Sequence, residues 1–219
     1  MVMKMIKVVA LIITVIVGVL AVGVASQAST IADYSGASLF TNQPLIENAT
    51  EGENPDVLYV LIMADEPLRS LLQERISKLA RSYSLEPVYV QMPSEEDLKK
   101  LQFKGRFLAV CVERLEKRRG ILSMKYSADA VIYYSSAGDV ENFVETYENR
   151  SADVEELAMT LKQRGAEEIL VRGNIGVAYW KNLKVYVGYL SRKPNDYPWR
   201  AMAEELMKEI ESFLKNSSD

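Results

Sequence analysis

Residues Val8 to Ala25 read VVALIITVIVGVLAVGVA, eighteen consecutive positions without a charge, an amide side chain or a proline. An α-helix of this length is about 27 Å long, close to the thickness of the hydrocarbon core of a bilayer. No polar face is available to turn toward water, so a buried helix of a globular core is a poor explanation. The stretch predicts a single membrane-spanning helix, through which the chain contacts the membrane.

Charge on either side of this stretch predicts its orientation. Lys4 and Lys7 precede it, whereas the forty residues after it contain no Lys or Arg. The positive-inside rule then places the N-terminus in the cytoplasm and the C-terminal domain outside the cell. The apolar run exceeds the usual signal-peptide core of about 7–15 residues, which favours an uncleaved signal-anchor. The alternative is cleavage after the small-residue run Ala25-Ser26-Gln27-Ala28, which would give a secreted protein.

The next segment, residues 29–55, is rich in Ser, Thr, Ala, Asn and Gly and has no basic residue. This composition predicts a flexible tether. The expected organisation is therefore a membrane anchor or signal segment over residues 1–28, a tether over 29–55 and one extracytoplasmic domain over 56–219. Three sequons would lie outside the cell and make a glycoprotein possible; they begin at Asn48, Asn149 and Asn216.

Apolar patterning after the tether predicts an α/β (α+β) domain. Residues 56–64 (DVLYVLIMA) form a nearly continuous apolar run, typical of a strand covered on both faces. A helix opening at Pro67 has its apolar residues on one face, and residues 87–92 and 107–115 are further strands. The first strand-helix-strand unit predicts a parallel pair. Later strands are expected over residues 121–126 and 130–134.

The second half of the domain adds helices and a hairpin. Helices are expected after Gly138, over 153–164 and over 198–215, each with one apolar face. Residues 169–180 and 183–190 are expected to form a hairpin that turns at Lys181-Asn182. The result is one mixed β-sheet packed by amphipathic helices, preceded by a transmembrane helix.

Composition excludes several classes of function. The chain has 26 basic and 30 acidic side chains, and two of the bases lie before the apolar stretch, so the domain repels phosphate backbones and is not expected to bind nucleic acid. There is no histidine, which removes Ser-His-Asp and Cys-His catalysis and the commonest metal ligand. The one cysteine, Cys111, lies in an apolar run and is expected to be a buried thiol. We predict no cofactor and no resident metal. Repeated Glu-to-Lys pairs fit a heat-adapted prokaryote.

Two sets of candidate catalytic or anion-binding residues follow strands. Asp65 and Glu66 come at the end of the first strand, where open sheets bind ligands, and could hold a divalent cation or act as a base. Helix capping explains the same residues. Ser135 and Ser136 precede a predicted helix and could cradle an anion, although capping again suffices.

A basic cluster and a group of aromatic residues are the candidate binding features. The cluster lies at a predicted hairpin turn and could meet lipid phosphates, an acidic glycan or carboxylates of a partner; its members are Arg114, Lys117, Arg118 and Arg119. A solvated turn is the plainer interpretation. Tyrosines concentrate in the second half of the chain, where core packing is the expected role.

These features favour a non-enzymatic, membrane-anchored module of the cell envelope that binds or assembles with a protein or glycan. The alternative is an extracytoplasmic metal-assisted hydrolase that uses Asp65, Glu66 and Asp139. A sensor is less well supported, because the residues before the membrane helix are too few for a cytoplasmic output domain.

Overall fold

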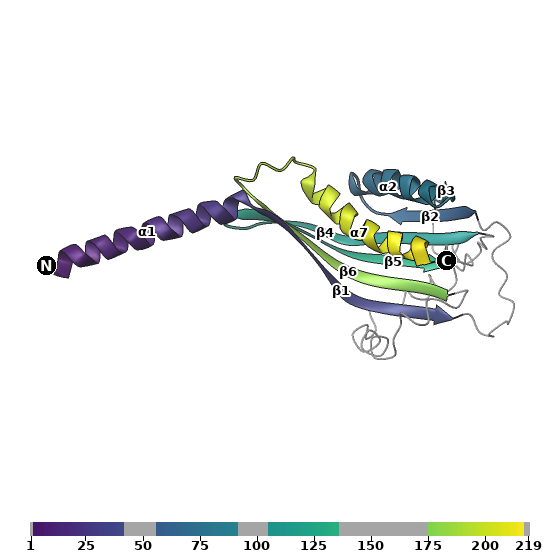
Figure 1. Cartoon of the computed structure of the whole chain (residues 1–219), viewed down its shortest axis with the longest axis horizontal. Helices are drawn as coiled ribbons and strands as arrows, with labels where there is room; N and C mark the ends of the chain where they lie inside the picture. Colours follow the sequence, from purple (N-terminus) through teal and green to yellow (C-terminus); the bar gives the residue numbers. More distant parts are fainter. Residues whose placement is uncertain (1, 42–55, 92–104, 136–174, 217–219) are drawn as a thin grey trace.

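The computed structural model describes residues 2–41, 56–91, 105–135 and 175–216 (Figure 1). A six-stranded sheet has the order β1-β6-β5-β4-β2-β3. Strand β2 is parallel to β3 and β4, and the other neighbours are antiparallel, which confirms the mixed sheet with helices packed on it. In chain order the elements are α1 (Val2–Ser26), β1 (Ala28–Thr41), β2 (Val57–Met63), α2 (Leu68–Ser82), β3 (Glu86–Tyr89), β4 (Arg106–Arg119), β5 (Ser123–Ser135), β6 (Ile175–Gly188) and α7 (Tyr197–Asn216).

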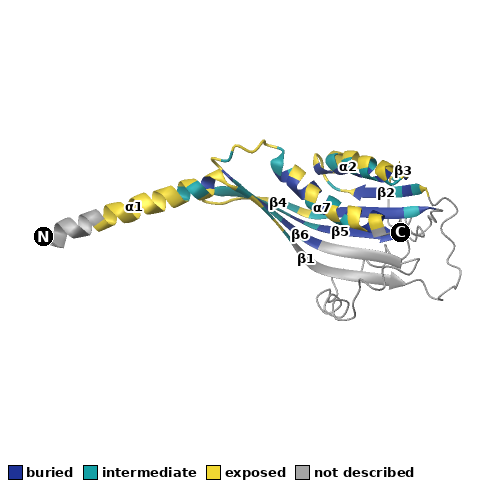
Figure 2. Ribbon diagram, in the orientation of Figure 1, coloured by how far each residue is buried: buried dark blue, intermediate teal, exposed yellow. Residues whose placement is uncertain are grey.

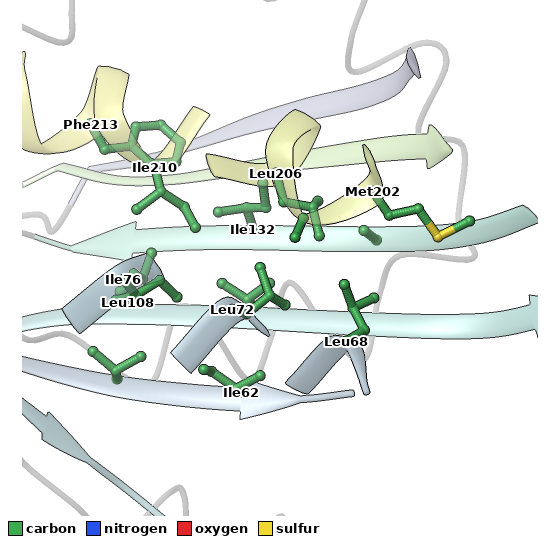
Figure 3. Packing of buried hydrophobic residues seen from close by; sticks show 14 of the residues in the cluster. Ile62, Leu68, Leu72, Ile76, Leu108, Ile132, Met202, Leu206, Ile210 and Phe213 are labelled. Atoms are coloured by element: carbon green, nitrogen blue, oxygen red, sulfur yellow. The ribbon is translucent and has the colours of Figure 1, made fainter. Parts of the chain in front are cut away.

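The core forms where α2 and α7 cover one face of the sheet (Figure 3). Apolar residues at helical spacing place one side of each helix against the strands. On α2 these are Leu68, Leu72 and Ile76, and on α7 they include Leu206 and Ile210, all at most 1% exposed.

The opposite face of the sheet is buried as well. Successive residues of a strand point to opposite faces of the sheet. Leu108 and Val110 belong to the core that includes α2 and α7, so Phe107, Ala109 and Cys111 point to the other face. All five are fully buried. This two-sided burial explains the continuous apolar runs and confirms Cys111 as a buried free thiol.

Four strands extend well beyond β2 and β3 toward α1 (Figure 1). Strands β1, β4 and β6 have 14 residues and β5 has 13, a length of about 45 Å. The hairpin turn predicted at the basic cluster lies later than expected, between Arg119 and Ser123, because β4 continues to Arg119. The expected strands 121–126 and 130–134 are one strand, β5. A bulge in β4 between Glu113 and Glu116 absorbs the irregular spacing, and Arg114 there has a positive φ of 48°.

The predicted hairpin at Lys181-Asn182 is also wrong. Strand β6 passes straight through both residues and pairs with β1 on one side and β5 on the other. Lys181 is 4% exposed, and its ammonium lies 2.8 Å from the Glu209 carboxylate of α7 and 3.3 Å from the Glu205 carbonyl oxygen. This ion pair lets a central strand carry a charge at a position that resembles a turn in the sequence.

The tether predicted over residues 29–55 is replaced, in its first part, by a strand. Residues Ala28–Thr41 form β1, which pairs along its length with β6. The small and polar residues of this segment lack the apolar pattern of a strand, and the pairing with β6 determines that it forms one. Residues 42–55 lie outside the described residues.

Helix α1 extends away from the sheet and is exposed along most of its length (Figure 2). Its span Val9–Ser26 is long and apolar enough to cross a membrane, and 6% of that span is buried. Only Gln27 separates α1 from β1, so the helix enters the sheet without a linker.

We expect a side chain at position 188 to separate α1 from the sheet. A Cβ on Gly188 would lie 2.0 Å from the Ala25 carbonyl oxygen, whereas one on Gly23 would meet nothing within 4 Å. Gly188→Ala should therefore lower the free energy of unfolding by roughly 1–3 kcal/mol, as overpacking does. Thermal unfolding of the purified chain in detergent measures this, with Gly23→Ala as the control. Equal melting temperatures for the two variants would contradict the close contact.

Removing one partner of the Lys181–Glu209 pair should be costly. Lys181→Met leaves the carboxylate of Glu209 without its buried cation, and we expect a loss of about 2–4 kcal/mol in urea unfolding. The double variant Lys181→Met with Glu209→Leu should recover much of that loss, because no charge is left without a partner. Equal stability of the single variant and the unmodified protein would show that the pair is not a structural link.

Candidate functional site

The end of α1 is joined to the sheet by hydrogen bonds between backbone groups. The last carbonyls of a helix have no partner within the helix. Here Leu190 N–H donates to the Ala25 carbonyl oxygen (2.8 Å), and Gly188 N–H donates to that of Gln27 (2.9 Å). Gly188 at the end of β6 and Leu190 just beyond it thus hold the last turn of α1 and the residue after it against the sheet.

The β4–β5 turn lies at the same place. Tyr189 N–H donates to the Leu122 carbonyl oxygen (3.1 Å), and its hydroxyl donates to that of Gly120 (2.8 Å). The guanidinium of Arg119 lies over the Tyr189 ring, 5.8 Å from its centroid. Three segments that are far apart in the sequence therefore meet where α1 ends.

The surface formed there combines exposed apolar and basic side chains. Ile121 is 96% exposed and Leu190 is 58% exposed. Residues 117–125 carry four cations and no acid, and residues 188–193 carry two cations and no acid, in a chain whose net charge is −4. We call residues 117–125 and 188–193 the junction surface.

The predicted basic cluster contributes only part of this surface. Lys117, Arg118 and Arg119 belong to it, with Lys117 5.5 Å from the centroid of the Tyr126 ring and Arg118 paired with Glu116 at 2.7 Å. Arg114 lies farther from the β4–β5 turn, at the bulge in β4.

Arg114 is paired instead with Asp129, at 3.7 Å. Strand pairing and the end of α1 bring further residues to the junction surface that were not among the predicted candidates, including Ile121, Lys125, Leu190, Arg192 and Lys193. The signal available in the sequence was an apolar residue, Ile121, inside a basic turn.

The acidic candidates are not brought together in the described part of the chain. The Glu66 carboxylate accepts hydrogen bonds from the hydroxyl (2.7 Å) and N–H (3.4 Å) of Ser70, in the first turn of α2. Asp65 is exposed, and Asp139 lies outside the described residues. Among the described residues, no group of three potential ligands could hold a metal ion.

The other predicted candidates have simple positions. Ser135 is buried at the end of β5, and Ser136 lies outside the described residues. Asn216 is the last residue of α7, whereas Asn48 and Asn149 are not described. Three aromatic pairs show that three of the tyrosines pack against other rings: Phe107–Tyr133, Tyr126–Trp199 and Tyr134–Phe213. Tyr189 is instead 44% exposed.

Shifted pKa values in the described residues follow from local structure. Lys78 lowers the pKa of Glu74, and Glu205 raises the pKa of Lys208, in both cases through an exposed ion pair on a helix. Burial raises the pKa of Tyr89, whose hydroxyl is hydrogen-bonded to Ser77 and donates to the Gln73 carbonyl oxygen. The first two shifts come from ion pairs between residues of the same helix, and the third comes from the packing of α2 on β3.

No family model matches the chain, and no curated protein matches it. Among solved structures, the PelC dodecamer from Paraburkholderia phytofirmans is similar over 86% of this chain and 97% of its own, with 12% identity and a TM-score of 0.35. A single-substitution variant of that dodecamer, from the same organism, gives 9% identity and a TM-score of 0.34, over 86% and 98% of the two chains. Scores at this level carry no conclusion about the function of this chain.

The contacts of Glu66 predict how the two acidic candidates differ. Glu66→Ala removes the acceptor for Ser70 and should lower stability by about 0.5–1 kcal/mol, whereas Glu66→Gln keeps an acceptor. Asp65→Ala should change stability by less than about 0.5 kcal/mol. Urea unfolding with and without Mg²⁺ measures both effects. A stabilisation by Mg²⁺ that both alanine variants abolish would contradict a capping role and favour a metal site.

Proposed function

We propose that the chain is a non-enzymatic, membrane-anchored module of the cell envelope that binds or assembles with a protein or glycan outside the cytoplasm. The observation that carries the proposal is the direct join of an exposed apolar helix to the sheet. A helix of this composition is stable in lipid, and its hydrogen bonds to Gly188 and Leu190 fix the sheet relative to it. The absence of histidine supports a role in binding rather than catalysis.

Retention of α1 fits these contacts better than cleavage does. The Ala25 carbonyl oxygen accepts a hydrogen bond from Leu190 N–H, and the Gln27 carbonyl oxygen accepts one from Gly188 N–H. Cleavage after Ala28 would remove both acceptors. The two lysines before the helix support a cytoplasmic N-terminus and an external sheet.

Strand β1 offers a surface for assembly. Over the part of the chain that the structure describes, β1 is the last strand of the sheet and pairs with β6 alone. Its fourteen residues include a single charge, Asp33. Long edge strands with little charge pair readily with a strand of another chain, which would give affinity through backbone hydrogen bonds. The proposed protein partner, or a second copy of the chain, adds a strand at this edge.

Membrane extraction followed by native mass spectrometry tests the proposal. We expect the full chain in the membrane fraction, released by detergent and accompanied by a partner. Ile31, on β1, is 43% exposed, and Val88, on the opposite edge strand β3, is 38% exposed, which makes them a matched pair. Ile31→Lys should reduce the co-purified partner at least tenfold, whereas Val88→Lys should not.

Two outcomes would contradict this proposal. Recovery of the full-length chain from cytosol without detergent would exclude the anchor. Recovery from membranes only as a lone chain, unchanged by Ile31→Lys, would exclude assembly at β1. Protease digestion of intact cells tests the topology, since an external sheet is cut without lysis.

A further inference from the structure

The junction surface has a composition that suits a membrane of anionic lipids. We infer that residues 117–125 and 188–193 dock on the bilayer beside α1, with Ile121 and Leu190 at the apolar boundary and the surrounding cations against lipid phosphates. This inference rests on the proposed function for the insertion of α1. It adds a second contact with the membrane, which the sheet makes at the bilayer surface.

The depth of the surface follows from its hydrogen bonds. Ala25 lies within the membrane-spanning stretch Val9–Ser26, and its carbonyl oxygen accepts from Leu190 N–H. Leu190 is therefore level with the last turn of α1. Tyr189 N–H donates to Leu122, which brings the β4–β5 turn to the same level. A bilayer that contains α1 therefore has its headgroups within reach of this turn.

The exposure of its apolar side chains has a physical explanation on this view. Ile121 is 96% exposed between basic residues of the turn, and Leu190 is 58% exposed at the same level. At the bilayer boundary the Ile121 and Leu190 side chains leave water. Tyr189, 44% exposed and held by Gly120, has the amphipathic character typical of residues at this depth.

The cations lie within reach of the phosphates. Ser123 pairs with Gly188 at the end of the sheet, and Lys125 follows two positions along β5, about 7 Å away. The headgroup region is about 5–8 Å thick on each side of the hydrocarbon, so arginine and lysine side chains near the turn extend into it. Glu116, at the border, pairs with Arg118 and offsets one charge. The remaining cations give the charge complementarity that selects an anionic lipid surface.

A fluorescent label at the turn measures the docking. The full chain, with Cys111→Ala and Ile121→Cys, is labelled with an environment-sensitive dye and inserted in nanodiscs of phosphatidylcholine with phosphatidylglycerol. Lipids that carry a nitroxide near the headgroup should quench this label several times more strongly than a label placed by Glu86→Cys. Glu86 begins β3 at the far end of the sheet. Only chains that elute with nanodiscs are measured, so failure of α1 to insert is scored separately.

Charge reversal separates lipid docking from simple proximity. The junction variant changes Arg119, Lys125 and Arg192 to Glu. The matched control reverses three exposed cations elsewhere, Arg69, Arg81 and Lys215. Each cation near an anionic surface changes the docking equilibrium by about fivefold, so the junction variant should lose most of the quenching and the control should keep it.

The unmodified surface gives an independent measurement. Added salt should weaken quenching of the Ile121→Cys label in anionic nanodiscs, because exposed charges are screened. Nanodiscs of phosphatidylcholine alone should give weak quenching. The inference is overturned if the two lipid compositions quench equally, if both charge variants behave alike, or if the label is quenched no more than the one at position 86.

Discussion

The hydrogen bonds between the last turn of α1 and the end of β6 are the constraint on which the rest of the structure depends. They satisfy the Ala25 carbonyl of the helix, which would otherwise need water or a capping residue, and the Gln27 carbonyl that follows the helix. They also require that residue 188 has no side chain. Through β6, which pairs with both β1 and β5, the position of the helix is transmitted to the whole sheet. A helix long and apolar enough to span a membrane and the sheet that follows it thus form one continuous unit.

Much of the fold could be predicted from local patterns. The apolar run of β2 and the one-sided apolar spacing of α2 and α7 depend on burial, and burial leaves a direct trace in the sequence. The errors lie where pairing between distant strands overrides local composition. Lys181 and Asn182 resemble a turn until the carboxylate of Glu209 is placed beside the lysine. The first half of the predicted tether is a strand because β6 lies next to it.

The candidate site was predictable only in part, for the same reason. The basic run at Lys117 to Arg119 is visible in the sequence. Its association with Leu190 and with the end of α1 depends on contacts between residues about 70 and 165 positions apart, for which local patterns hold no information. For the acidic residues, by contrast, the local sequence was sufficient to predict their position at a helix terminus. Asp65 and Glu66 are adjacent in sequence, and the contacts of Glu66 are those of a helix terminus.

The lack of a linker between α1 and β1 has a mechanical consequence. A transmembrane helix tilts to match the thickness of the bilayer around it. With the long strands continuing for about 45 Å beyond the helix, a change of about 10° in tilt would swing the distal edge of the sheet by about 8 Å. In the proposed membrane-anchored state, the joined helix and sheet would pivot together at the bilayer surface, and the position of the outer end of the sheet would vary with the surrounding lipids.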